Sequence, residues 1–337
     1  MNFSILIPHF KSKITAYAIH KILENQWKHE VEIVIIDNSN DESVKYLYPY
    51  RGKVGYITYP KDRIQSHGCA FDYALELGLV TNEYFITLES DSFPVKENWL
   101  DLYEKCINEG YETGASLLQL SGGEYGHPCG AFYKTSIWNE AKEYCDNIEY
   151  SYFPNMSYSF GFNCHLMIHN SVIDSVLETP EDYIELANDY KGLSKEEMLA
   201  KRDYYKPVVA PFHNGMGKLN ETLATYGRRC PKTQMPNILL DGKPKLINRI
   251  GYEPGQWFFY WQLAMKKKVI IFPTETKWLP NRENQQQEYT ETANGLRHIW
   301  CGSSYLDMKE SDPFVYKFKH NQIEELYNSL PENLKIK

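Results

Sequence analysis

The chain has 337 residues and a formal net charge of −8, a length that allows one large domain or two modest ones. This acidic balance disfavours non-specific nucleic-acid binding, which needs a basic surface, so we expect no nucleic-acid partner. No apolar run approaches the about 20 residues of a membrane-spanning helix, and the opening MNFSILIPHF lacks the long apolar region of a signal peptide. The seven scattered cysteines never form a CxxC pair and therefore predict reduced thiols in a cytoplasmic protein.

The first third of the chain alternates apolar strands with helices. Strands are predicted at residues 3–7, 31–36, 54–59 and 84–88, and helices at residues 14–27 and 68–79. Continuous apolar strands that alternate with helices are typical of a parallel sheet covered on both faces. Pro8, Asp37, Glu89 and Asp91 each follow the end of one of these strands, so one rim of the sheet should gather them.

The rest of the chain has weaker periodicity. Helices are predicted at residues 97–109, 136–145, 180–203, 255–266 and 320–330, and strands at residues 115–120, 129–133, 164–168 and 269–272. The segment SGGEYGHP before Cys129 indicates a flexible turn, and residues 206–250 and 280–295 indicate loops. A loop as long as the first of these is usually functional or mobile.

Two carboxylates follow the buried strand in the stretch YFITLESDSFP, at Glu89 and Asp91. Ligands of open α/β sheets bind beyond the carboxyl ends of the strands, and neighbouring carboxylates repel each other unless a cation lies between them. Hard divalent cations such as Mg²⁺ and Mn²⁺ take oxygen ligands and often bind substrate phosphates as well. The pattern therefore indicates a carboxylate–metal–diphosphate site, and its alternative is a solvated acidic turn that caps the next helix.

Four motifs occur in a suggestive order: SILIPHF, EIVIIDNSNDES, SHGCAFDYALELG and YFITLESDSFP. Together they resemble the family 2 inverting glycosyltransferases of the GT-A fold, closely over residues 3–100 and loosely over residues 250–305. The resemblance implies an α/β fold of GT-A type with a Rossmann-like, mostly parallel sheet flanked by helices. It also implies transfer of a sugar from a nucleotide-sugar donor, a UDP-linked one in the first place, to the hydroxyl of a glycan or other acceptor.

The resemblance assigns several residues to the donor. Asp37 matches the carboxylate that accepts a hydrogen bond from the uracil or ribose, and its alternative role is a helix N-cap. Pro8 and Phe10 match the loop that lines the nucleobase. His67 and Asp72 match residues near the phosphates and the sugar, although His67 could equally cap the helix that begins beside it.

The same resemblance assigns the metal and the base. Glu89 and Asp91 match the DxD motif, with Glu as a departure in the first place, and Asp91 is expected to be the more direct ligand of Mn²⁺ or Mg²⁺. His298 matches a third metal-side residue that is often found late in GT-A chains, and a neutral imidazole is a reasonable ligand for manganese. Glu253, in GYEPGQWFFYW, is the expected base that deprotonates the acceptor hydroxyl. The rival bases are Asp241, Glu221 and Glu124.

We expect a single domain over residues 1–310, in which residues 1–100 bind the donor and residues 101–310 the acceptor, followed by a helical extension at residues 311–337. A catalytically silent member that binds only a carbohydrate or nucleotide is the alternative, because Glu replaces the first Asp of the motif and no Glu-Asp pair accompanies Glu253. A sugar nucleotidyltransferase is disfavoured, because its first loop needs glycines and here it reads PHFKSKIT.

Overall fold

The structure, a computed structural model, describes residues 1–26, 28–39, 41–58, 67–120, 123–146, 258–259, 262, 265–281, 286–300 and 302–336. The chain divides into two compact units. The first comprises Met1–Ser116, His127–Ser136 and Val269–Lys337, and the second comprises Leu117–Gly126 and Ile137–Lys268. The helix and strand predicted at residues 180–203 and 164–168, and most of the helix at 255–266, lie outside the described residues.

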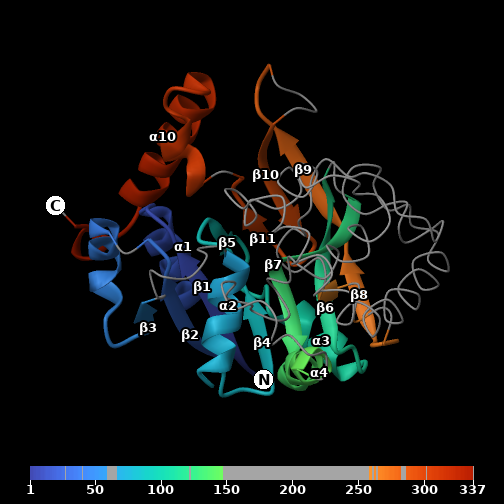
Figure 1. Ribbon diagram of the computed structural model, residues 1–337. Helices are drawn as coiled ribbons and strands as arrows, with labels where there is room; N and C mark the ends of the chain where they lie inside the picture. Colours follow the sequence, from blue (N-terminus) through green and yellow to red (C-terminus); the bar gives the residue numbers. More distant parts are fainter. Residues whose placement is uncertain are drawn as a thin grey trace, which may run out of the picture. The chain divides into compact units, whose positions relative to one another are not determined.

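Seven described strands form a mixed sheet in the order β3-β2-β1-β4-β7-β6-β8. Their bounds are β1 Asn2–His9, β2 Glu30–Asp37, β3 Gly55–Thr58, β4 Tyr84–Thr87, β6 Thr113–Leu120, β7 Gly123–Lys134 and β8 Val269–Phe272. Strand β1 runs parallel to β2 and β4, β2 parallel to β3, and β6 parallel to β8, whereas β7 runs antiparallel to β4. The blue strands β1, β2 and β3 lie side by side in Figure 1. The predicted α/β class with a mostly parallel sheet is confirmed.

Helices cover this sheet through apolar faces. Helix α1 (Ile14–Glu24) buries Ile14, Ala18 and Ile22 completely, and α2 (His67–Glu76) buries Ala70 and Ala74 completely. The helix predicted at residues 68–79 ends earlier, at Glu76, and Leu77 just beyond it is 51% exposed. The remaining helical segments are η1 Glu42–Tyr50, α3 Asp101–Asn108, α4 Thr135–Asp146, η3 Ser304–Met308, α10 Pro313–Asn328 and η4 Glu332–Leu334.

Parallel pairing brings the carboxyl ends of the central strands to one edge. His9, the last residue of β1, pairs with Asp37, the last residue of β2. On the other side of β1, Leu6 pairs with Thr87, the last residue of β4. The segment that carries Glu89 therefore leaves the sheet at the same edge as Asp37, as the strand pattern predicts.

A second, antiparallel sheet of four strands has the order β5-β11-β10-β9. Its strands are β5 Ser92–Pro94, β9 Thr274–Trp278, β10 Gln287–Thr292 and β11 Leu296–His298. The prediction of a loop over residues 280–295 is wrong where β10 lies. This strand reads QEYTET and buries Glu288 and Thr292, so polar residues occupy the inward positions that an apolar alternation would have marked.

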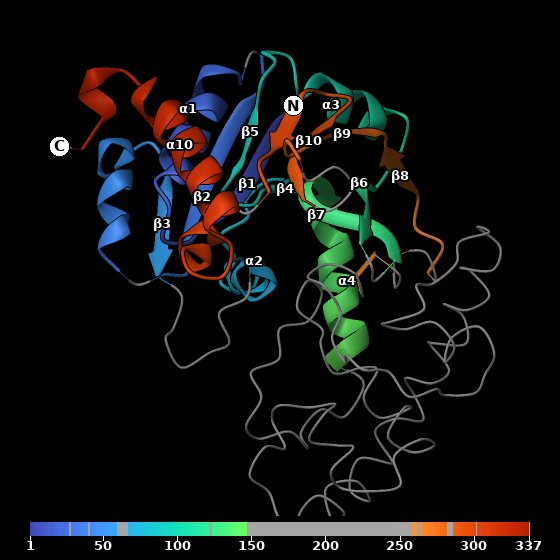
Figure 2. The same cartoon turned by 90° about the horizontal axis from the view of Figure 1, so that it is seen from above.

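The C-terminal helix α10 begins earlier than predicted, because Asp312 accepts a hydrogen bond from the Val315 N–H and Pro313 occupies the first turn. Helices α10 and α1 lie side by side in both views (Figures 1 and 2), and Lys13 forms an ion pair with Glu324 between them. None of the helices in the described part of the chain combines the length and apolar character needed to cross a bilayer.

Candidate functional site

Strand pairing places His298 beside the two carboxylates. His298 ends β11 and pairs with Ser92, the first residue of β5, directly after Asp91. The Ile299 N–H donates to the carbonyl oxygen of Asp91 at 3.0 Å, and the Ser92 N–H donates to the carbonyl oxygen of Glu89 at 3.1 Å. One backbone hydrogen bond within the turn and one from a distant part of the chain thus fix the turn that carries both acids.

The side chains meet at short distances. The Nε2 atom of His298 lies 3.1 Å from Oε2 of Glu89 and 3.3 Å from Oδ1 of Asp91. The Gly302 N–H donates to Oδ2 of Asp91 at 2.7 Å. A Cβ atom on Gly302 would lie 2.5 Å from Cβ of Asp91, so only glycine allows this close approach. The structure therefore brings together the three residues that the sequence assigned to a metal.

Asp91 has the environment of a cation ligand. Its side chain is 4% exposed, and its Oδ1 atom is buried without a hydrogen-bond partner among the described residues. A buried carboxylate oxygen that accepts no hydrogen bond is costly unless a positive charge compensates it, and its charged neighbour here is Nε2 of His298 at 3.3 Å. Ligand atoms of Glu89, Asp91 and His298 all lie within 4.8 Å of one another, and two carboxylates with one imidazole suit Mn²⁺. The residues present therefore fit a divalent cation.

Electrostatics couple His298 to its neighbours. Burial lowers the pKa of His298, but nearby Cys129, Glu89 and Asp91 outweigh that effect and raise the pKa well above its ordinary value. Burial acts to raise the pKa of Glu89, but the charge and hydrogen bond of nearby His298 above all hold it well below its usual range. In the absence of a cation, a protonated His298 therefore lies between the two carboxylates.

Glu89 is surrounded by imidazoles. Besides His298, Nε2 of His127 lies 3.3 Å and Nε2 of His67 lies 3.5 Å from Oε1 of Glu89. His127 was missed at the sequence level because SGGEYGHP was interpreted as a turn, whereas β7 begins at Gly123 and carries His127 into the sheet. The GHPCG pattern, a histidine two residues before a cysteine, is the one local signal that could have marked it.

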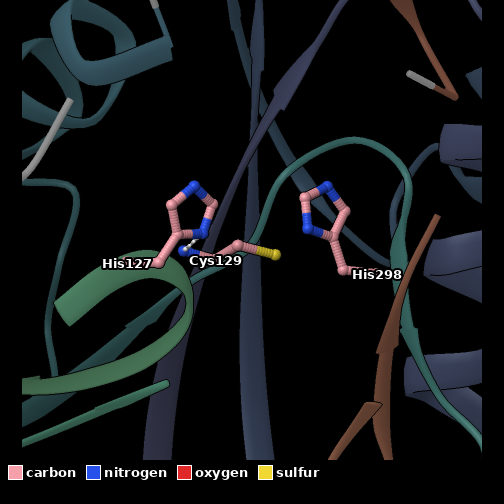
Figure 3. Close-up of side chains that lie close together, drawn as sticks. All are labelled: His127, Cys129 and His298. Atoms are coloured by element: carbon pink, nitrogen blue, oxygen red, sulfur yellow. Dashed lines mark hydrogen bonds between the residues drawn. The ribbon is translucent and has the colours of Figure 1, made fainter. Parts of the chain in front are cut away.

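A second set of possible metal ligands, His127, Cys129 and His298, overlaps the first (Figure 3). The Cys129 N–H donates to Nδ1 of His127 at 3.2 Å, so that nitrogen is unprotonated and the proton of neutral His127 resides on Nε2. Burial lowers the pKa of His127 to about 3, which keeps the ring neutral. Neither ring nitrogen then offers a lone pair to a metal, and the structure favours the set with Glu89 and Asp91.

Asp37 is held by polar neighbours at the end of β2. Its Oδ1 atom accepts hydrogen bonds from Ser39 N–H at 3.1 Å and from Ser39 Oγ at 2.8 Å, and its Oδ2 atom accepts one from Tyr56 Oη at 2.7 Å. The helical segment that follows is capped by Asp41, which accepts a bond from Ser43 N–H. The alternative role of Asp37 as a helix cap therefore belongs to Asp41.

The other expected donor residues have different environments. Pro8 is buried in β1, and Phe10 is half-buried with the Lys11 ammonium 4.8 Å from its ring centroid. Asp72 is completely buried in α2, and the side chain of His67 is 35% exposed. His67 begins α2, which agrees with either of its expected roles.

The expected base, Glu253, lies outside the described residues, as do its rivals Asp241 and Glu221. Glu124 lies in β7.

No protein-family model and no curated protein matches the chain. Solved structures with some likeness include three enzymes of low identity. Staphylococcus aureus TarS, residues 1–349 with UDP, has 16% identity over 44% of this chain and 49% of its own, at a TM-score of 0.31. The mannosyltransferase PcManGT of Pyrobaculum calidifontis, with GDP-Man and Mn²⁺, has 11% identity over 41% of this chain and 46% of its own, at a TM-score of 0.34. The 4-diphosphocytidyl-2C-methyl-D-erythritol synthase of Anaerococcus prevotii has 12% identity over 44% of this chain and 76% of its own, at a TM-score of 0.32.

The chain spans half or less of the length of the TarS chains that it matches. TM-scores of this size establish neither a shared fold nor a shared activity.

Proposed function

We propose that the protein is a metal-dependent inverting glycosyltransferase of the GT-A type that uses a nucleotide-sugar donor, UDP-linked in the first place. The observation that carries the proposal is the convergence of Glu89, Asp91 and His298, in which Nε2 of His298 lies 3.1 Å from one carboxylate and 3.3 Å from the other. Glu89 and Asp91 follow β4, which ends at the same edge of the seven-stranded sheet as Asp37. The four motifs that resemble family 2 support the same assignment.

In this proposal Asp91 and His298 hold Mn²⁺ or Mg²⁺, with Glu89 beside them. When bound, the cation neutralises the charge that develops on the departing nucleoside diphosphate. Asp37 accepts a hydrogen bond from the base or ribose, and Pro8 and Phe10 line the base.

Glu253 takes the proton of the acceptor hydroxyl as its oxygen bonds to the anomeric carbon. The bond from that carbon to the diphosphate oxygen breaks on the opposite face, which inverts the configuration.

A silent member that binds a nucleotide or carbohydrate without a metal is the second candidate. The observation that favours it is the arrangement around Glu89, where three imidazoles already surround the carboxylate. A protonated His298 can then balance part of the charge without a cation.

Titration of the purified full chain with Mn²⁺, followed by the electron paramagnetic resonance of free Mn²⁺, separates these candidates. Wild type should bind Mn²⁺ and hydrolyse UDP-sugar slowly in its presence. Asp91→Asn should lose both while its circular dichroism is unchanged, because the amide removes the anionic ligand. Glu24→Gln, at an exposed acid paired with Lys21, is the matched control. Equal Mn²⁺ binding by Asp91→Asn and wild type would remove the metal site, and UDP binding without Mn²⁺ binding would favour the silent member.

A further inference from the structure

The two carboxylates of the site are held differently. Three imidazoles face the oxygens of Glu89, His67 and His127 at Oε1 and His298 at Oε2, whereas Asp91 has Oδ2 on the Gly302 N–H and Oδ1 at 3.3 Å from Nε2 of His298. We propose that His127 is a positioning residue, whose Nε2–H holds Oε1 of Glu89 and so aims Oε2 at the place shared by His298 and Asp91. This inference rests on the proposed metal site and adds a residue to it.

Hydrogen bonding fixes which nitrogen of His127 is the donor. Its Nδ1 atom accepts the Cys129 N–H at 3.2 Å, drawn as the dashed line in Figure 3. The proton of the neutral ring is therefore on Nε2, which lies 3.3 Å from Oε1 of Glu89. Because the His127 side chain is only 9% exposed, solvent screens this contact little. A fixed tautomer is what a positioning residue requires.

The framework around His127 is rigid. Strand β7 pairs antiparallel with β4, from Tyr84 opposite Lys134 to Thr87 opposite Ala131. Beyond that ladder the Thr87 hydroxyl donates to the Pro128 carbonyl. His127 and Glu89 thus extend from neighbouring, hydrogen-bonded strands, and the ladder sets the distance between their side chains.

His298 and Cys129 are the other neighbours that hold the His127 ring. The rings of His127 and His298 are stacked, with centroids 5.8 Å apart and planes 15° apart, and the Cys129 sulfur lies 2.6 Å from Ser92 Oγ. Metal ligands are commonly oriented by such neighbours, whose loss typically costs about 10- to 100-fold in metal affinity. His67 is a weaker candidate for the same role, because it lies farther from Glu89 and its side chain is 35% exposed.

The test compares three substitutions of His127 by the Mn²⁺ dissociation constant of the full chain. His127→Met fills the space without a donor and should weaken Mn²⁺ binding about tenfold or more. His127→Gln places an amide N–H near the position of Nε2 and should restore most of the affinity. His127→Asn has an amide one carbon too short and should behave like Met. The control is His320→Met, at a half-buried histidine of α10 whose ring stacks on Tyr316, and it should not change Mn²⁺ affinity.

A double-mutant cycle with Glu89→Gln shows whether the effect passes through Glu89. If it does, His127→Met should cost much less Mn²⁺ affinity in the Glu89→Gln background than in wild type. Equal costs in both backgrounds, or equal weakening by Gln and Met, would overturn the positioning role. If His127→Met does not fold, the comparison of His127→Gln with His127→Asn decides, and equal Mn²⁺ affinities of these two variants would overturn the positioning role. A wild-type chain that binds no Mn²⁺ would instead overturn the proposed function, and the positioning role with it.

Discussion

Gly302→Ala is a small change that should disturb the metal site directly. The added Cβ would lie 2.5 Å from Cβ, 2.8 Å from Oδ2 and 3.1 Å from Cγ of Asp91. Carbon atoms in contact are normally about 3.5–4.0 Å apart, so Asp91 and the backbone at residue 302 must separate by about 1 Å. Strand pairing on both sides of Asp91 prevents the neighbours from absorbing all of that shift.

The expected loss follows from the hydrogen bond between these residues. The Gly302 N–H donates to Oδ2 of Asp91 at 2.7 Å, and a separation greater by about 1 Å would break that bond. A hydrogen bond to a charged group contributes about 1.5–3 kcal/mol, and about 1.4 kcal/mol corresponds to a factor of ten in affinity. If the bond holds Asp91 in the orientation that a cation needs, the Mn²⁺ dissociation constant should rise roughly 10- to 100-fold.

Mn²⁺ titration of Gly302→Ala, wild type and Gly55→Ala measures this loss. Gly55 is an exposed residue of β3, and a Cβ there would meet its nearest atom at 3.6 Å, an ordinary contact, so Gly55→Ala should bind Mn²⁺ like wild type. Circular dichroism of each variant checks that the fold is intact. A folded Gly302→Ala with wild-type Mn²⁺ affinity would refute the role of the Gly302–Asp91 contact in cation binding.

Three further predictions concern the donor, the base and acid stability. Asp37→Ala should weaken UDP binding, measured by calorimetry, by about 1.5–3 kcal/mol, the contribution of a hydrogen bond to a charged group. An unaltered dissociation constant would mean that Asp37 only stabilises the turn with Ser39. Glu253→Gln should lose sugar transfer but keep donor binding, and normal transfer would place the base elsewhere. Burial lowers the pKa of His9 to about 4, so the unfolded chain takes up its proton first. The free energy of unfolding should therefore fall as pH drops from about 6.5 towards 4, and fall less in His9→Gln; equal pH profiles in chemical denaturation would contradict this.

Local sequence was sufficient for the sheet that carries the site. Strands β1, β2 and β4 are continuous apolar runs, and each begins and ends within a few residues of its predicted bounds. Strands that are buried on both faces of a sheet need apolar residues at every position, so the apolar run in the sequence directly marks each buried strand. The position of Asp37, Glu89 and Asp91 at one edge followed from strand direction alone.

Contacts between distant segments were beyond local patterns. The polar strand β10 owes its place to pairing with β9 and β11. The Glu288 carboxylate accepts a hydrogen bond from Lys277, and the Lys319 ammonium donates to the backbone carbonyl of Glu288. His127 reaches Glu89 only because β7 returns antiparallel beside β4. Neither pairing register leaves a periodicity in the sequence, since polar residues at inward positions look the same as polar residues in a loop.

Charge balance explains why Glu in the first place of the motif is compatible with a cation. Its longer side chain has both oxygens beside imidazole nitrogens, while the shorter Asp91 has Oδ1 beside His298 and Oδ2 on the Gly302 N–H. His127 is neutral, because burial lowers its pKa to about 3, so it orients Glu89 without cancelling its charge. A proton on His298 supplies one positive charge against two carboxylates. Unbalanced charge is costly in a buried site, and a dication that replaces this proton compensates the pair more fully.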